Sequence, residues 1–88
     1  MFVITVLDHD LDRMNACEEA VKRALKKVGI RANVTQVSEP PYLSRLNIWD
    51  RMPALEIEGK IWSKKGKEAY TVDEVVRLLT MLFLDEKS

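Results

Sequence analysis

The chain has one cysteine, no net charge and no long apolar run, and each of these absences excludes a class of protein. Because Cys17 has no partner in the chain, an oxidised secreted mini-scaffold held by disulfides is excluded. The 14 basic and 14 acidic residues cancel, so no overall field favours nucleic acid or an anionic membrane. No apolar run approaches the about 20 residues that cross a bilayer. These absences predict a cytoplasmic protein that binds neither nucleic acid nor membrane.

Glycine and proline are scarce, with three of each in 88 residues, and no segment has the composition of a linker. Apolar residues make up 47% and charged residues 32%, which is typical of a folded globular domain and not of a disordered chain. A chain of this length has room for one domain, which we expect to span residues 1–88. Residues 2–7 are apolar, but they are too few for a signal peptide and lack its basic leader.

The first half of the chain predicts a strand, a helix and a second strand. Residues 2–7 are apolar and β-branched, which is typical of a strand covered on both faces. From about residue 12 or 15 to residue 28, apolar side chains recur every three or four positions, which predicts a helix that ends at Gly29. Residues 30–37 alternate, and their apolar side is formed by Ala32, Val34 and Val37. With short links, these elements form a βαβ unit with parallel strands.

The middle of the chain predicts a hairpin after an irregular segment. Prolines 40–41 interrupt the chain, and residues 42–50 predict one or two helical turns at most. Residues 54–63 alternate apolar and polar side chains on either side of Glu58-Gly59, which indicates two strands joined by a tight turn. Gly59 supplies the positive φ that such a turn requires.

The last helix contains more apolar residues than one buried stripe uses. Thr71 and Glu74 form a capping box that opens this helix, and we expect it to run to about residue 84. From 75 to 84, eight of ten residues are apolar, whereas a buried stripe takes about half. The surplus consists of Leu78, Met81 and Leu84. It predicts a docking surface for a protein partner or a homodimer through residues 71–84, unless the core covers this helix deeply.

The element order β-α-β-(α)-β-β-α, with Met52-Pro53-Ala54 heading the third strand, resembles the thioredoxin fold. It is most similar to the small thioredoxin/glutaredoxin-like proteins, and the resemblance covers nearly the whole chain. It depends on Val28-Gly29-Ile30, on residues 52–60 and on the helix over 71–84. The resemblance implies an α/β domain with a four-stranded mixed sheet flanked by helices. It also implies a cis Met52–Pro53 peptide bond beside the site that is the redox centre in the family.

The chain departs from this family at that centre. The family's Cys-x-x-Cys positions are occupied here by Leu11 and Met14, and the chain contains no other such pair. Dithiol exchange within one chain needs two sulfur atoms, so we expect no dithiol oxidoreductase activity. The resemblance leaves a binding groove beside the proline, which we expect to be lined by His9, Asp10, Leu11, Met14, Met52 and Pro53.

Cys17 has two interpretations. As a functional residue it would be a thiol activated by the start of the helix, acting as a monothiol with glutathione. As a structural residue it would be a small buried hydrophobe on the apolar stripe, since free cysteines are among the most buried residues. Thiolate formation is opposed electrostatically by the nearby acids Asp8, Asp10, Asp12, Glu18 and Glu19. The sequence favours the buried interpretation.

The acidic loop over residues 8–12 invites other hypotheses. Asp8 and Asp10 follow an apolar strand, as in the haloacid-dehalogenase-type phosphatases, but the chain is too short for the other motifs of that family. A Ca²⁺ loop would take its ligands from Asp8, Asp10, Asp12 and Glu19. Arg13, however, occupies the position where that loop needs glycine. We expect a solvated loop without metal or cofactor, whose acids favour the start of the helix, and we expect His9 on its surface.

A lysine-rich segment around Trp62 suggests a nucleic-acid-binding surface that combines positive charge with base stacking. The segment is short, however, and we expect a solvated hairpin. Trp49 and Trp62 are expected to cover the edge of the core or to line the groove beside Pro53. The sequence thus predicts a non-catalytic thioredoxin-like binding module that uses this groove or the last helix. The alternative is a monothiol, glutaredoxin-like redox protein acting through Cys17.

Overall fold

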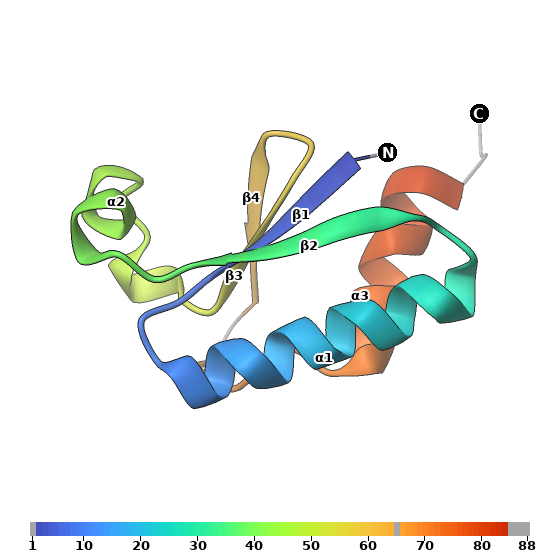
Figure 1. Ribbon diagram of the computed structural model, residues 1–88, viewed down its shortest axis with the longest axis horizontal. Helices are drawn as coiled ribbons and strands as arrows, with labels where there is room; N and C mark the ends of the chain where they lie inside the picture. The colour runs from blue at the N-terminus through green and yellow to red at the C-terminus, as the bar shows by residue number, and fades with distance from the viewer. Residues whose placement is uncertain (1, 65, 85–88) are drawn as a thin grey trace.

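The computed structural model describes residues 2–64 and 66–84, without the side chain of Leu84, and all structural statements refer to these residues. Figure 1 shows the elements: β1 (Phe2–Leu7), α1 (Leu11–Val28), β2 (Ala32–Val37), α2 (Pro40–Arg45), β3 (Ala54–Ile57), β4 (Lys60–Ser63) and α3 (Val72–Leu79). A 3₁₀ turn (Trp49–Arg51) precedes β3, and a π-helical turn (Thr80–Leu84) continues α3. The predicted order of elements is confirmed.

The four strands form one mixed sheet in the order β2-β1-β3-β4. β1 pairs in parallel with β2 and antiparallel with β3, and β4 completes a hairpin with β3. The hairpin turns at Glu58 and Gly59, whose φ angles of 54° and 80° suit a two-residue turn, as predicted. The Met52–Pro53 peptide bond is cis, as the resemblance implied. The chain is therefore an α/β domain with a four-stranded mixed sheet.

One face of the sheet is covered by α1 and α3, which Figure 1 shows on the same side of the strands. The main core lies between these layers. Its buried members are Ile4, Val6, Met14, Cys17, Ala20, Val21, Ala24, Leu25, Leu55, Ile57, Tyr70, Val75 and Leu79. With the exception of Ala20, the side chains of α1 in this list belong to the apolar stripe that the sequence periodicity predicted.

The opposite face of the sheet is covered only at one end. There α2 and the following turn bury a second cluster, formed by Leu7, Leu43, Ile48, Met52 and Ala54. The six residues of α2 span about 9 Å, which is too short to cover the strands along their length. Val3 at the other end of β1 is therefore 46% exposed. The prediction that both faces of residues 2–7 are covered is therefore wrong for the half of β1 that contains Val3.

β2 also differs in detail from its predicted pattern. The strand begins at Ala32, and its partners across the sheet place Val37 beside Leu7 and Val34 beside Ile4. Ala32 and Val34 pack against the main core, whereas Val37 packs against the second cluster. Grouping Val37 with the other two was wrong, because side chains an odd number of positions apart on a strand point to opposite faces.

The helix ends follow their capping signals. α1 begins at Leu11, one residue before the predicted range, because the side chain of Asp10 caps it by accepting the N–H of Arg13. Gly29, with φ 74°, ends α1 as predicted. The prolines at 40–41 begin α2 instead of interrupting the chain, since the first helical positions need no intrahelical N–H. The capping box at the start of α3 is confirmed.

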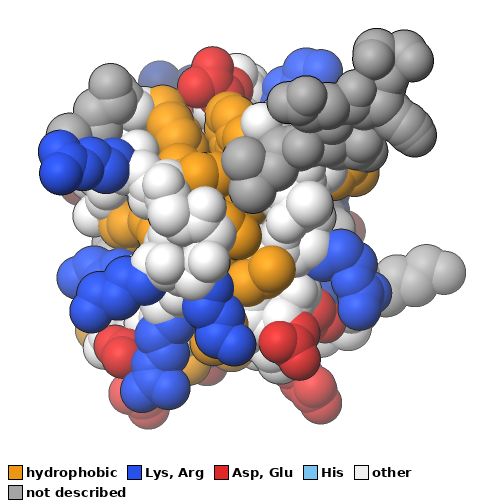
Figure 2. Space-filling view, turned by 90° about the vertical axis from the view of Figure 1, so that its right-hand side faces the viewer, with side chains coloured by type: hydrophobic (Ala, Val, Ile, Leu, Met, Phe, Trp, Pro, Cys, Tyr) orange, Lys and Arg blue, Asp and Glu red, His pale blue; other side chains and the backbone are white. Residues whose placement is uncertain are grey.

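The surplus of apolar residues in the last helix is only partly exposed. Leu78, predicted to be left over, packs against the main core, while Met81 is 50% exposed. Phe83 is 37% exposed, and its ring stacks on that of Phe2 with centroids 4.6 Å apart. The side chain of Leu84 lies outside the described residues. Figure 2 views this end of the molecule and shows apolar side chains gathered at its centre, with basic side chains beside and below them.

In the described part of the chain, no helix has both the length and the apolar character that a bilayer crossing requires.

Candidate functional site

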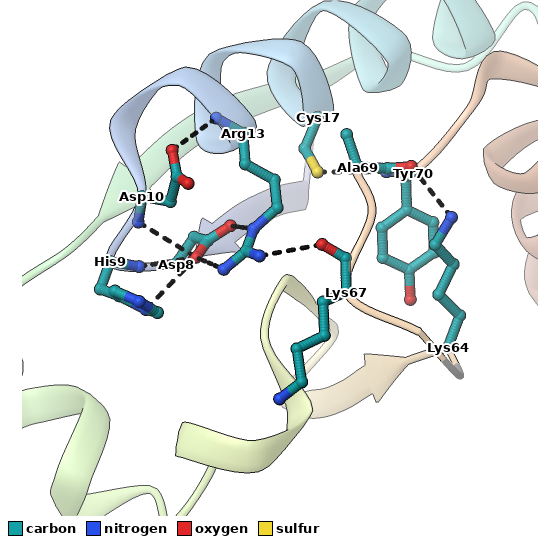
Figure 3. A network of polar contacts seen from close by, with 9 residues as sticks. All are labelled: Asp8, His9, Asp10, Arg13, Cys17, Lys64, Lys67, Ala69 and Tyr70. Carbon is teal, nitrogen blue, oxygen red and sulfur yellow. Dashed lines mark hydrogen bonds and ion pairs between the residues drawn. The ribbon is translucent and has the colours of Figure 1, made fainter.

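The loop between β1 and α1 lies at the end of the sheet where the sequence placed the candidate groove. It meets the start of α1 and the segment that leads into α3, as Figure 3 shows. A buried carboxylate, a guanidinium and a thiol, all from residues 8–17, contact the segment before α3 here through the backbone of Lys67 and Tyr70. Their contacts determine whether this end of the sheet can do chemistry.

Asp8 is fully buried, and the donors to its carboxylate all come from residues close to it in the sequence. Its carboxylate accepts the backbone N–H groups of His9 and Asp10 at 2.7 and 3.2 Å. Arg13 donates to both carboxylate oxygens, with Nε and Nη2 each at 2.6 Å. The remaining arm of that guanidinium donates to the backbone carbonyl of Lys67 at 2.9 Å. The pair therefore fixes the loop before α1 to the segment before α3 (Figure 3).

Burial alone would raise the pKa of Asp8, because it removes water from the charged form. The hydrogen bonds from Arg13 and from the two backbone N–H groups outweigh burial and hold the pKa of Asp8 below its ordinary value. The same contact raises the pKa of Arg13. Both groups are therefore charged in the folded protein at neutral pH.

The prediction of a solvated loop is wrong for Asp8, although it holds for His9, Asp10 and Asp12, which are exposed. Both oxygens of Asp8 are occupied by a guanidinium, so this carboxylate is not free to attack a substrate or to bind a cation. Asp10 uses its carboxylate to cap α1. The signal that could have revealed the pair is an aspartate at the end of an apolar strand, followed by an arginine in the first turn of the next helix.

Cys17 is a core residue, as the sequence favoured. Its side chain is 0% exposed, and the Sγ atom accepts the backbone N–H of Tyr70 at 3.3 Å. Burial raises the pKa of the Cys17 thiol, and the N–H of Tyr70 offsets only part of this effect. A thiol that is both inaccessible and hard to ionise is a poor nucleophile, because the thiolate is the reactive form.

The segment leading into α3 is fixed from a second direction. The ammonium of Lys64 donates to the carbonyl of Ala69 at 2.9 Å and to Glu74 Oε1 at 2.8 Å. It also lies 5.4 Å from the ring centre of Tyr70 (Figure 3). The hydrogen bond from Lys64 is the main reason that the pKa of Glu74 is lowered, and burial raises the pKa of Tyr70 to about 12. Lys64 is therefore used within the fold and not as part of a solvated basic surface.

The six residues predicted to line the groove are His9, Asp10, Leu11, Met14, Met52 and Pro53, and the structure divides them into two sets. The first three are exposed, while the last three are buried. Met14 belongs to the main core and Met52 to the second cluster. The buried three are not accessible to a partner, which at this place would contact the exposed residues.

Trp49 joins the exposed set from the turn that precedes β3. Its ring lies 5.2 Å from the ring of His9 between centroids, and Trp49 is 40% exposed. Leu11 is 61% exposed, more than any other large apolar side chain that the structure describes. We call the side chains of His9, Leu11 and Trp49 the rim. The rim is mainly apolar and aromatic, and two of its members, His9 and Leu11, closely follow the buried and fully paired Asp8 in the chain.

Three hollows lie elsewhere on the described part of the molecule. One of about 340 Å³ is lined by Phe2, Val3, Thr5, Glu56, Glu58 and Gly59. A second, of about 310 Å³, is lined by Ile57, Glu58, Lys60, Trp62, Leu82 and Phe83. A third, of about 410 Å³, lies on α1 and is lined by Glu19, Lys22, Arg23 and Lys26. None of the three includes a residue of the predicted groove. Trp62 thus lies beside the last helix and not beside Pro53.

No protein-family model, curated protein or solved structure matches the chain. The function is therefore inferred from the arrangement of the residues themselves.

Proposed function

We propose that the protein is a non-catalytic, thioredoxin-like binding module that holds a protein partner on the rim. The order of elements, the mixed sheet and the cis Met52–Pro53 bond support the thioredoxin-like assignment. The observation that carries the function is the exposure of Leu11 and Trp49, 61% and 40%. Leu11 follows His9 by two residues, and the ring of Trp49 lies 5.2 Å from the ring of His9. Exposed large apolar side chains grouped at one place are typical of an interaction surface.

The groups that could do chemistry at this end of the sheet are used structurally. Leu11 and Met14 stand at the positions where the related family has its two thiols. Cys17 is buried, with a raised pKa, and Asp8 is held by Arg13. These contacts argue against the alternative of a monothiol redox protein that works with glutathione through Cys17.

The charges around the rim indicate the chemistry of the partner. Asp10 and Asp12 flank Leu11 in the sequence, and Asp50 follows Trp49; all three are exposed. Arg13 is paired with Asp8, and Arg51 is directed to Ser63 and the Ile61 carbonyl of β4, so the charges that adjoin Leu11 and Trp49 directly in the sequence are acidic. A peptide segment with an apolar side chain flanked by lysine or arginine complements such a surface in both packing and charge.

The last helix offers a second docking surface, because Met81 and Phe83 remain exposed there. The ring of Phe83 is already stacked on Phe2, and Leu78 packs on the core, so less apolar surface is left than the sequence predicted. A homodimer through residues 71–84 therefore stays a prediction, and the rim is the stronger candidate.

The test is a selection of peptides from a random displayed library on the full chain, with counter-selection on the double variant Leu11→Ser, Trp49→Ala. We expect the selected peptides to contain an apolar residue flanked by basic ones. By calorimetry, they should bind the wild type and the matched control Met81→Ser equally, and the double variant at least about tenfold more weakly. Circular dichroism checks that each variant is folded. Peptides that bind the double variant as well as the wild type would contradict the proposal.

A further inference from the structure

The two edges of the sheet differ in how far they are available for pairing. β4, at one edge, has four residues, and Arg51 covers it by donating to the carbonyl of Ile61 at 3.3 Å and to Ser63 Oγ at 3.1 Å. β2, at the other edge, has six residues with no charge and no proline among them. Within residues 2–64 and 66–84, no further strand pairs with that edge. Edge strands of monomeric proteins usually carry a charge, a proline or a bulge that prevents pairing, and β2 has no charge or proline.

The direction of the free backbone groups of β2 follows from one hydrogen bond. The carbonyl of Val37 accepts the N–H of Asp8 at 3.3 Å, so the peptide groups of Val37 face β1. Backbone groups alternate in direction along a strand, so Thr35 also faces β1, whereas Val34 and Gln36 face away from the sheet. The outer edge of β2 therefore presents the N–H and C=O groups of Val34 and Gln36.

We propose that this edge binds β2 of a second copy of the chain, antiparallel and across a two-fold axis at Thr35, so that two four-stranded sheets become one continuous sheet. In such a symmetric contact the same surface serves both copies. The axis places Val34 opposite Gln36 of the second copy, and both of these residues present outward N–H and C=O groups. Thr35 meets its own copy at the axis.

Charge complementarity selects a second copy in this register. With the axis at Thr35, Arg31 lies opposite Glu39 of the second copy, once on each side of the axis. Glu39 has an extended backbone, with φ −74° and ψ 121°, so the pairing can continue to it. Both residues are exposed, and within the described residues neither forms a salt bridge in its own chain.

Neighbouring registers lose this match. A residue whose backbone groups face outward must lie opposite another residue of that kind in the second copy. The two-fold axis can therefore pass through any residue of β2 but not midway between two residues. With the axis at Val34, Arg31 would lie opposite Val37 of the second copy. With the axis at Gln36, it would lie opposite Pro41, which has no N–H. The register at Thr35 alone brings opposite charges together at both ends of the paired strands.

The test measures the dimer dissociation constant of the full chain by sedimentation equilibrium at low ionic strength. The variants Arg31→Glu and Glu39→Arg each place like charges opposite one another, and each should weaken the dimer at least about tenfold. The double variant Arg31→Glu, Glu39→Arg restores opposite charges and should recover the wild-type dissociation constant. A mixture of the two single variants should form heterodimers, because one chain then carries both acids and the other carries both bases.

The variant Met81→Lys separates this contact from one through the last helix, and it should leave the dimer unchanged. A wild-type chain that is monomeric up to about 1 mM would overturn the proposal. So would a dimer that is insensitive to the Arg31 and Glu39 variants but is lost in Met81→Lys. Peptide binding at the rim does not involve β2, so failure of one proposal is distinguishable from failure of the other.

Discussion

The end of the sheet where α1 begins contains two sets of side chains that differ in their surroundings. Asp8, Arg13 and Cys17 are inside, where they are hydrogen-bonded to one another or to the backbone. Leu11 and Trp49 are outside and largely exposed. Asp8, Arg13 and Cys17 are thus committed to holding the fold, while Leu11 and Trp49 remain available for the partner that we propose. Burial separates the side chains that hold the fold from those that we propose contact a partner.

The largest expected effect comes from removing the charge of Asp8. Asp8→Asn keeps the shape of the side chain but leaves Arg13, only 17% exposed, without its counter-ion. Breaking a buried pair from one side costs about 3 kcal/mol, and we expect the free energy of unfolding in urea to fall by that amount. The matched control Asp10→Asn should change it by less than about 0.5 kcal/mol, because asparagine also caps a helix. Equal effects of the two variants would remove the contrast between the buried and exposed acids.

Acid should abolish the contribution of Asp8. The folded-state pKa lies below the ordinary value of 3.8, so the folded protein binds fewer protons than the unfolded chain between these values. The stabilisation is complete above the ordinary value and is lost as the pH falls through the folded-state pKa. The unfolding free energies of wild type and Asp8→Asn, measured from pH 7 to pH 2, should therefore converge below about pH 4. A constant difference between the two curves would contradict the pairing.

A smaller loss is expected on truncating the buried thiol. Cys17→Ala removes the acceptor of the Tyr70 N–H and leaves a small cavity in the main core. We expect the free energy of unfolding to fall by about 1–2 kcal/mol. The neighbouring residue Ala16 is exposed, so Ala16→Ser provides the control and should be nearly neutral. A Cys17→Ala variant as stable as the wild type would show that the thiol is not part of the core.

The smallest effect on stability should come from the rim. Leu11→Ser removes an exposed side chain and should change the free energy of unfolding by less than about 0.5 kcal/mol. The same variant should lower the affinity for a rim-binding peptide at least about tenfold, because an apolar anchor at an interface is lost. Measuring the free energy of unfolding and the peptide affinity on one preparation directly tests the division between the residues of the fold and those of the rim. A large loss of stability would place Leu11 in the fold and not in the rim.

The sequence predicted those parts of the structure that depend on neighbouring residues. The turn at Glu58-Gly59, the capping box at Thr71 and the end of α1 at Gly29 each follow from the conformational preferences of a few consecutive residues. The interpretation of the prolines at 40–41 failed because the same residue can interrupt a helix or begin one. The helical turns around them were nevertheless expected.

The parts that failed depend on contacts between distant segments. The burial of Asp8 depends on a guanidinium that also reaches the carbonyl of Lys67. The exposure of Val3 depends on the short length of α2. Of the residues predicted to line the groove, His9 and Leu11 are exposed, but hydropathy could not show that Met14 turns into the core while Leu11, three positions earlier, remains exposed.

The most direct test of the central claim is the rate at which iodoacetamide alkylates Cys17 in the folded chain as a function of pH. The matched control is Ala16→Cys in a Cys17→Ala background, which places a thiol one position away on the exposed side of α1. We predict that the control reacts readily, whereas folded Cys17 reacts only at the rate at which the protein opens, and quickly once the chain is denatured. Rapid alkylation of folded Cys17, with an apparent pKa below the free value of about 8.5, would contradict the account and indicate a monothiol enzyme.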